Sequence, residues 1–228
     1  MFGHKPKVLH YGLQRSGTNF LEMVLNKKFR VRVCNSNKDR RNPLQKHFRL
    51  YDNKNVISDP QYINNIIIRN FTYFESLLPF IPSSIIVISK DPYSWFKSYT
   101  RWAEKCHWPP VSHHYIEEYN LFYSKWLEMS EQSAKIKFVR YCDLLQNGED
   151  IIPFLEEKTG LTPASSGFSF RSGLQKVPQS SKFSTDRRDY YLSERYLKEF
   201  GWPEIDALNR HLDVRTTMRL GYEKRELP

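Results

Sequence analysis

The stretch KVLHYGLQRSGTNFLEMVL, residues 7–25, decides the fold class, because it predicts a strand, a glycine-containing loop and a helix in that order. Residues 7–11 predict the strand, and apolar side chains at positions 20, 21, 24 and 25 recur with the period of a helix. Two glycines, Gly12 and Gly17, enclose four loop residues. This spacing, after a strand and before a helix, is typical of a loop that binds an anion through backbone N–H groups and the helix N-terminus.

A second unit of the same kind begins at residues 83–89, SSIIVIS, which predict a strand buried on both faces of a parallel sheet. Pro92 predicts the start of a helix that runs to about Glu104, because proline at the first helical turn lacks only an N–H that would have no helical partner. Further strands are expected at 29–34 and 136–141, with helices at 151–158, 190–200 and 205–211. Strands that alternate with helices predict a three-layer α/β fold with a central parallel sheet, and the 228 residues fit one domain, 1–228.

An aromatic stripe and several turn residues complete the predicted elements. Tyr115, Tyr119, Phe122, Trp126 and Met129 are spaced by four, three, four and three residues, which predicts the core face of a helix rather than a cofactor-binding segment. Turns or surface loops are expected at 35–43, 147–148 and 161–186, and the glycine at position 160 is expected to end the helix before it.

The composition is that of a basic protein, which predicts attraction to anions, although a basic surface that serves only solubility is the other reading. Lys plus Arg number 35 against 25 Asp plus Glu, a formal net charge of +10, which does not choose among nucleic acids, anionic glycans and phosphorylated small molecules. The 3 cysteines are widely spaced without a CxxC pair, so neither a disulfide framework nor a zinc site is indicated and a reducing cytoplasm is expected. No apolar run has the length of a signal peptide or of a membrane span, so secretory, Golgi-anchored and membrane placements are disfavoured.

The loop after the first strand lacks the residues that a nucleoside triphosphatase uses. Such an enzyme needs Lys and then Ser or Thr after the second glycine, to reach the terminal phosphates and bind magnesium, whereas this chain has Thr18 and Asn19. Arg15 stands inside the loop instead, followed by Ser16, and its guanidinium can bind a tetrahedral anion through two hydrogen bonds. A cation at that place would also stabilise charge that develops on a leaving phosphate oxygen. We therefore expect Arg15 both to bind the anion and to act in catalysis.

A second candidate site follows the buried strand, within residues 89–98, SKDPYSWFKS. Ligands of open α/β sheets bind in the crevice at the carboxyl ends of the strands. Lys90 in the loop and Ser98 on the following helix are expected to converge there on one phosphate.

Together the two segments resemble the sulfotransferases that use 3′-phosphoadenylyl sulfate (PAPS), which have a P-loop fold. In that family an Arg-Ser-Gly-Thr-type loop binds the 5′-phosphosulfate, and a later Arg-x-Pro-type element, with a Ser eight residues after its basic residue, binds the 3′-phosphate. Lys90 stands where the family usually has Arg, so the charge is kept without the fork-shaped guanidinium. The resemblance implies that the 5′ end of the nucleotide is bound by Gln14, Arg15, Ser16, Gly17, Thr18 and Asn19, and the 3′-phosphate by Lys90 and Ser98.

The resemblance also covers residues 138–145, FVRYCDLL, which are similar to the family's strand-end Tyr-Glu-Asp-Leu element with Cys142 in place of Glu. Tyr141 would then lie near the adenine, although an ordinary strand-end tyrosine is the alternative reading of this residue. In the family a basic loop near the C-terminus closes over the 3′-phosphate. Ser181 and Lys182, followed by two arginines, are the candidates for that loop here.

The general base is expected near His47. A sulfuryl acceptor is an alcohol, phenol or amine, and the loss of its proton requires a histidine or carboxylate within hydrogen-bond reach. His47 lies in the region where the family usually places its base, with Lys46 or Arg49 expected to neutralise charge on the leaving group. Asp52 and Asp59 are the carboxylate alternatives, and a histidine with only a packing role is the other reading of His47.

The expected activity is transfer of a sulfuryl group from PAPS to a hydroxyl of a small-molecule or glycan acceptor, which yields 3′,5′-adenosine bisphosphate (PAP). Two other classes remain open at this point, namely a P-loop small-molecule kinase or nucleotide-binding protein, and a basic nucleic-acid or polyanion-binding protein. The first lacks the expected magnesium ligand, and the second gives no reason for the first strand, loop and helix. No metal is expected, because Cys106 is directly adjacent to His107 rather than at a usual ligand spacing.

Overall fold

The structure, a computed structural model, describes residues 5–35, 44–47, 49–50, 68–164 and 185–226. Its centre is a four-stranded sheet with the strand order β2-β1-β3-β4, in which every pair of neighbours is parallel. The strands are β1 (Lys7–Tyr11), β2 (Arg32–Val33), β3 (Ser84–Ser89) and β4 (Ile136–Arg140). This sheet, with helices between its strands, confirms the predicted α/β class.

Strand β3 lies inside the sheet and all six of its residues are buried, as its β-branched sequence predicts. Its neighbour β1 is in a register that places Tyr11 opposite Val87, close to the carboxyl end of both strands. The loops that follow β1 and β3 therefore leave the sheet at the same edge. The sheet itself brings the two candidate anion-binding segments together.

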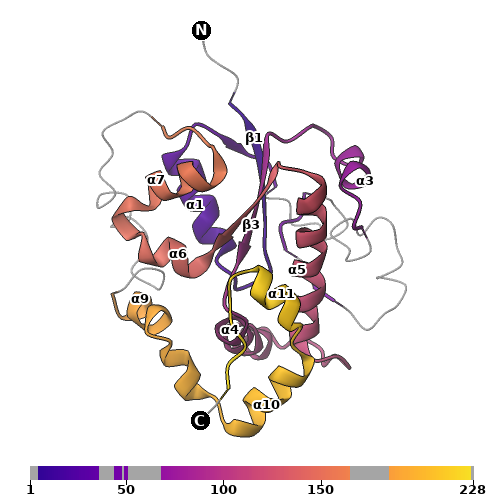
Figure 1. The fold of residues 1–228 in the computed structure, drawn as a ribbon, viewed down its shortest axis with the longest axis vertical. Helices are drawn as coiled ribbons and strands as arrows, with labels where there is room; N and C mark the ends of the chain where they lie inside the picture. The colour runs from indigo at the N-terminus through magenta and orange to yellow at the C-terminus, as the bar shows by residue number, and fades with distance from the viewer. Residues whose placement is uncertain (1–4, 36–43, 48, 51–67, 165–184, 227–228) are drawn as a thin grey trace.

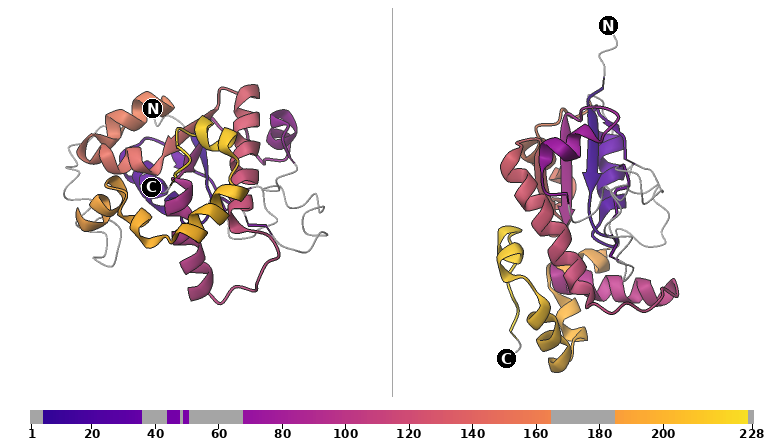
Figure 2. Two further views of the ribbon diagram at one scale, coloured as in Figure 1. Left: turned by 60° about the horizontal axis from the view of Figure 1, so that its bottom comes forward. Right: turned by 90° about the vertical axis from the view of Figure 1, so that its right-hand side faces the viewer.

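Helices cover both faces of the sheet, because successive residues of a buried strand point to opposite sides. Ile86 and Ile88 pack with α1 (Thr18–Lys28) and α7 (Ile151–Thr159). Ile85 and Val87 pack in a second cluster, with α4 (Pro92–Lys105) and α5 (Tyr115–Gln132). Figure 1 shows α1 and α7 on one side of the strands and α5 on the other, and the left view of Figure 2, with the lower end brought forward, keeps α7 and α5 on opposite sides.

The remaining helices are short. They are α3 (Phe71–Ser76), α6 (Tyr141–Gln146), α9 (Thr185–Leu192), α10 (Trp202–His211) and α11 (Val214–Arg219), with 3₁₀ turns η1 (Gly148–Asp150) and η2 (Arg195–Glu199). In Figure 1, α4, α9 and α10 lie at the lower end of the molecule, beyond the carboxyl ends of β1 and β3. They therefore stand beside the edge at which the two loops emerge.

The aromatic stripe is the core face of α5, as predicted. Tyr119, Trp126 and Met129 are fully buried and Phe122 nearly so, while Tyr115 at the helix start is partly buried. Trp126 packs against Tyr11 of β1 with ring centroids 4.6 Å apart. These rings fill the space between α5 and the sheet.

Three predicted elements differ from the structure. The strand expected at 29–34 is only β2, because Phe29 instead bridges to Pro163 and the N–H of residue 30 bonds to the carbonyl of residue 162. The helix expected at 190–200 is interrupted at Glu194, whose φ of 55° is left-handed and incompatible with a continuous helix. Tyr141 is the first residue of α6 rather than the last of β4.

Candidate functional site

The loop of residues 12–17, here called the anion loop, turns sharply between β1 and α1. Arg15 and Gly17 have φ values of 72° and 102°, both in the left-handed region, and the N–H of Ser16 bonds back to the carbonyl of Leu13 at 3.2 Å. Gly17 is the N-cap of α1 and makes no side-chain capping bond, and the first turn of α1 carries no acidic residue. The positive end of the helix dipole is thereby left available to an anion.

Both glycines of the anion loop are required by close packing. A Cβ on Gly12 would stand 2.6 Å from Ser16 Oγ and 2.8 Å from Ile88 Cγ2. A Cβ on Gly17 would stand 2.5 Å from Cδ2 of the Tyr141 ring, in addition to its unfavourable φ. Tyr141, which directly follows the carboxyl end of β4, therefore packs on the anion loop.

The segment after β3 is built differently. Lys90 Nζ donates a hydrogen bond to Ser98 Oγ at 2.8 Å, so the two residues that are eight apart in sequence meet in space. The N-terminus of α4 already has an anionic cap, since the carboxylate of Asp91 accepts from the N–H groups of Tyr93 at 3.1 Å and Ser94 at 3.0 Å. An anion at this second place would therefore be bound by the side chains of Lys90 and Ser98 rather than by the helix N-terminus.

One pocket, of about 420 Å³, lies against both segments, and this volume is within the range of small-molecule sites. Its walls come from α1 and the anion loop, from α4, and from the segments that carry residues 47, 141 and 191. They are Gln14, Arg15, Gly17, Thr18, Asn19, Phe20, His47, Lys90, Ser98, Trp102, Tyr141 and Tyr191. The structure thus brings most of the predicted nucleotide-binding residues to one cavity.

Lys90 lies between two tyrosine rings at this pocket. Its side chain is nearly inaccessible, with 3% of the residue exposed, and its Nζ stands 4.2 Å from the ring centroid of Tyr191 and 5.6 Å from that of Tyr141. The two rings meet edge to face with their centroids 5.4 Å apart. Aromatic faces stabilise an ammonium group at such distances, so Lys90 is held in one place at the pocket wall.

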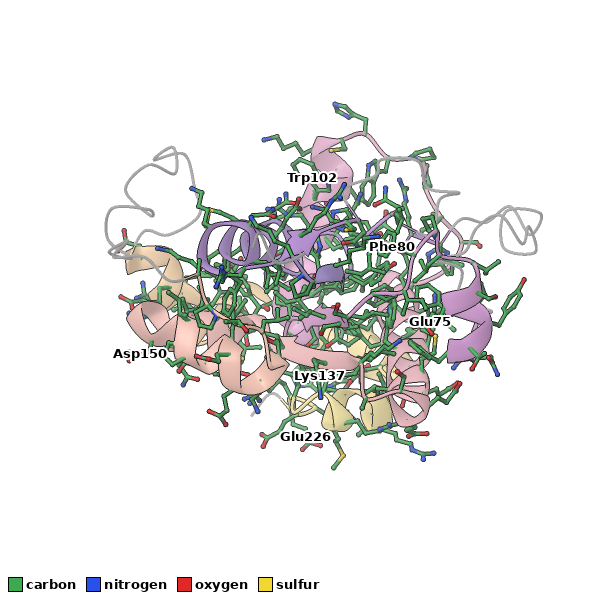
Figure 3. All side chains as sticks on the ribbon, turned by 90° about the horizontal axis from the view of Figure 1, so that it is seen from above. Glu75, Phe80, Trp102, Lys137, Asp150 and Glu226 are labelled. Carbon is green, nitrogen blue, oxygen red and sulfur yellow. The ribbon has the colours of Figure 1, made fainter. Side chains whose placement is uncertain are left out.

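Arg15 is held at the pocket in a similar way. Its guanidinium carbon stands 4.9 Å from the ring centroid of Trp102, and Arg15 forms no salt bridge within the described residues. Trp102 is labelled in Figure 3, on the part of α4 that lies at the opposite side of that view from Lys137 of β4. The indole packs on the guanidinium without neutralising its charge, which remains available for an anion.

Gln14 ties the two segments together and leaves one polar atom without a partner. Its carbonyl accepts a hydrogen bond from Trp95 Nε1 of α4 at 2.9 Å. Its side-chain Oε1 is buried and has no hydrogen-bond partner among the described residues. Buried amide oxygens normally have a partner, so this atom is an exception at the pocket.

His47 reaches the pocket from the segment 44–47. Its Nδ1 lies 3.2 Å from the carbonyl oxygen of Gly12, and because a carbonyl only accepts, Nδ1 carries the proton and Nε2 keeps the lone pair. Burial lowers the pKa of His47 to about 4, and the nearby ammonium of Lys46 also lowers it, while the bond to Gly12 acts in the opposite direction. The ring is therefore neutral at pH 7 and able to accept a proton.

Two expected site residues are placed away from the pocket wall. The ammonium of Lys46 is engaged by Glu22, with which it forms an ion pair, and by Asn19 Oδ1 at 2.8 Å, and Lys46 does not line the pocket. Ser16 is fully buried, and its hydroxyl donates to the carbonyl of Leu13 at 2.8 Å. Neither residue is among those that line the pocket, and the expected roles of Lys46 and Ser16 stay predictions.

The structure does not describe four other expected residues, and it places Arg49 against another partner. Ser181 and Lys182 of the C-terminal loop, and the alternative bases Asp52 and Asp59, lie outside the described residues. Arg49 stacks on Trp108, with 3.8 Å between its guanidinium carbon and the ring centroid.

Sequence reasoning missed two of the pocket's aromatic walls. Tyr191 belongs to α9 and Trp102 to α4, and no motif singles out either residue. The one available signal is the spacing between Ser98 and Trp102, since residues four apart share one face of a helix.

The histidines after α4 do not form a metal centre within the part of the chain that the structure describes, where no group of three or more His, Cys, Asp or Glu is arranged to hold an ion. His113 instead faces the buried carboxylate of Glu118 at 3.0 Å, and Tyr99 donates to the same carboxylate at 2.7 Å. His114 is stacked between Phe96 and His211. Among the described residues, no helix combines the length and apolarity needed to cross a membrane.

The fold and the site define a class of protein before any comparison, namely an α/β protein with a parallel sheet and a pocket lined by a glycine-containing loop and a helix N-terminus. A comparison with protein-family models found no match, and a search of curated proteins found no significant relative. The arguments for a function therefore come from the sequence motifs and from the residues of the pocket.

Proposed function

We propose that this chain is a sulfotransferase with a P-loop fold, which transfers a sulfuryl group from PAPS to an acceptor hydroxyl. The observation that carries the proposal is the convergence of three sequence segments, around Arg15, Lys90 and Tyr141, on one pocket of about 420 Å³. Those are the segments in which the sequence resembles the PAPS-dependent family. Their convergence is expected if the three segments bind one nucleotide.

The charge distribution in the pocket supports a ligand with two separate anionic ends. One end would meet the anion loop, with the N-terminus of α1 and the guanidinium of Arg15. The other would meet Lys90 and Ser98, whose hydrogen bond of 2.8 Å presents an ammonium and a hydroxyl together. Tyr141, which packs against Gly17, and Tyr191 offer ring surfaces for a base between or beside these ends.

The proposed reaction is an in-line displacement at sulfur. The acceptor oxygen forms a new S–O bond, its proton passes to His47, and the S–O bond to the 5′-phosphate breaks, which leaves PAP with the additional negative charge. Arg15 and the N–H groups of the anion loop stabilise the charge that develops on the bridging oxygen. The balance needs no redox partner, because the sulfuryl group leaves one oxygen and joins another.

His47 suits the role of the base in its protonation state. With Nδ1–H directed to the carbonyl of Gly12, Nε2 is the atom that can take the proton. Its low pKa in the ligand-free chain makes it a weak base, and a bound polyanion is expected to raise that pKa by stabilising the imidazolium. Donor binding would therefore prepare the base.

The first experiment is a comparison of ligands by thermal shift. PAP should raise the melting temperature of the chain in a concentration-dependent way, whereas ATP with magnesium should have a smaller effect, because a ligand that binds only the folded state stabilises it by mass action. The second is transfer of radiolabelled sulfate from PAPS to a panel of phenols, alcohols and glycans. An absence of any shift with PAP would overturn the proposal.

The same experiments separate the two rival classes. A larger shift with ATP and magnesium than with PAP would indicate a kinase or nucleotide-binding protein. Binding to RNA or heparin that falls steeply with salt, without any effect of PAP, would indicate a polyanion-binding protein.

A further inference from the structure

The carboxylate of Glu22, on α1, contacts both His10 of the sheet and Lys46, the residue before His47. Glu22 Oε2 forms an ion pair with Lys46 Nζ and lies 3.4 Å from Nε2 of His10. His10 belongs to β1, is fully buried, and has its Nδ1 2.8 Å from Asn35 Oδ1. The nearby His10 ring, together with Lys46, holds the pKa of Glu22 at about 2, so the carboxylate is charged at neutral pH.

The backbone of Lys46 and the ring of His47 are attached to the anion loop through the N–H and the carbonyl of Gly12. The N–H of Gly12 donates to the carbonyl of Lys46 at 3.2 Å, and the carbonyl of Gly12 accepts from Nδ1 of His47, also at 3.2 Å. The side chain of Lys46 adds Asn19 and Glu22 as partners, and Glu22 is the charged one. The place of the His47 ring therefore depends on how residue 46 is held.

We propose that Glu22 is a positioning residue that acts through Lys46 to hold the His47 ring against the anion loop. Glu22 does not line the pocket, so it has no direct contact with a ligand there. The catalytic consequence rests on the proposed function, whereas the placement of the ring is a property of the folded chain and is measurable without substrate.

Removal of Glu22 is expected to displace the His47 ring because it leaves the ammonium of Lys46 without a counter-charge. The side chain of Lys46 is only 14% exposed, and an ammonium that loses its counter-charge in such a place is strongly disfavoured. The side chain is then expected to turn toward water and to draw the backbone of residue 46 with it. The two hydrogen bonds to Gly12 would be lost together, and the His47 ring would leave its partly buried position at the pocket wall.

An NMR titration of the full chain tests this placement, because the loss of the Glu22 charge and the displacement of the His47 ring would change the pKa of His47 in opposite directions. In Glu22→Gln, loss of the negative charge alone would lower the pKa of His47, since Glu22 raises it while Lys46 and His10 lower it. Release of the ring from burial would raise that pKa from about 4 toward 6.5. We expect a rise of at least one unit, and an unchanged or lower value would overturn the proposal.

Two further variants make the titration decisive. Glu22→Asp keeps the charge but shortens the side chain, so a rise in the pKa of His47 in this variant reports position alone, and it also serves if Glu22→Gln does not fold. Glu75→Gln is the matched control, because Glu75 on α3 forms a comparable ion pair with Lys135 at 2.6 Å away from the pocket. The NMR signal of His47 is identified by its absence in His47→Gln. In Glu75→Gln this signal should titrate as in the unmodified chain.

The kinetic arm separates this proposal from the proposed function. In Glu22→Gln, the kcat of sulfuryl transfer should fall about 10- to 100-fold, as for a displaced general base, while the affinity for PAP changes by less than about twofold. A change in PAP affinity equal to the change in kcat would contradict the positioning role. If no transfer is found in the unmodified chain, the proposed function fails, and the NMR result still decides the role of Glu22.

Discussion

The two strand, loop and helix units of this chain are similar in order but differ at the helix N-terminus. In the first unit, β1 to α1, the cap is Gly17, which leaves the helix dipole and the N–H groups to an anion. In the second, β3 to α4, Asp91 occupies the N-terminus with its own carboxylate, and the cation Lys90 stands beside it. A parallel sheet therefore presents two adjacent candidate anion sites of different kinds, one made largely of backbone and one made of side chains.

The largest effect is expected from Arg15, the one charged side chain of the backbone-built site. Arg15→Ala should lower kcat of sulfuryl transfer by about 10³-fold, because it removes the cation at the place where charge develops. Steady-state kinetics with PAPS measures this loss. Arg101→Ala is the control, since Arg101 is exposed and pairs with Glu199 on the surface. Near-normal turnover of Arg15→Ala would remove the first site from the mechanism.

The second test concerns the capped helix and uses pH. Burial raises the pKa of Asp91 to about 6 from its ordinary 3.8, so between these pH values the folded state binds more protons than the unfolded state. The free energy of unfolding of the unmodified chain should therefore rise, relative to Asp91→Asn, as the pH falls from 7 to 4, by at most about 3 kcal/mol. Urea denaturation across that range measures the difference, and a relative loss of stability at low pH would contradict the assignment.

The third test separates the two sites by ligand. Lys90→Ala should raise the Kd for PAP by about 10- to 100-fold, the usual effect of losing a charged hydrogen bond, and should change the Kd for adenosine 5′-monophosphate much less. Isothermal titration with both nucleotides measures this. Lys97→Ala is the control, since Lys97 lies on α4, the helix that follows Lys90, and pairs with Glu204. Equal weakening of both nucleotides would show that Lys90 does not recognise a separate 3′-phosphate.

The smallest expected effect distinguishes two glycines with positive φ. Gly160→Ala has φ 69° and open space around its new Cβ, so it should lower the free energy of unfolding by about 1 kcal/mol. Gly17→Ala should lower it by about 1 kcal/mol more, because its Cβ meets the ring of Tyr141 at 2.5 Å. Denaturation curves measure both losses. Equal losses would mean that Tyr141 moves away at no cost and does not fix the anion loop.

Much of the fold could be predicted from sequence, because the decisive signals are local. The β-branched run of β3, the proline at the start of α4 and Gly160 at the end of α7, where φ is 69°, each specify their own backbone. The edge strand β2 was overestimated because residue 29 pairs with a segment more than a hundred residues later. No local pattern reports such a partner.

The candidate site was predicted where a motif specifies the backbone and missed where tertiary contacts decide. Arg15, Lys90 and Ser98 line one pocket as their motifs suggest, but the side chain of Ser16 turns inward to a carbonyl of its own loop. Tyr191 belongs to α9, which ends at Leu192 just before the break at Glu194, and its distance in sequence from the other motifs hides it. Exposure and partner choice of single side chains are set by the assembled fold.

The hydrogen bond between Trp95 Nε1 and the carbonyl of Gln14, 2.9 Å long, bears on which adenosine bisphosphate isomer, 2′,5′ or 3′,5′, the protein would bind more tightly. It joins the helix that carries Ser98 to the loop that carries Arg15, so the protein sets the separation of the two anion sites before a ligand arrives. A nucleotide with its phosphates on the 2′ and 5′ positions would have to stretch this scaffold or leave one phosphate poorly bound. We expect it to bind less tightly than the 3′,5′ isomer, and Trp95→Phe, which removes this bond, to reduce the difference between their Kd values.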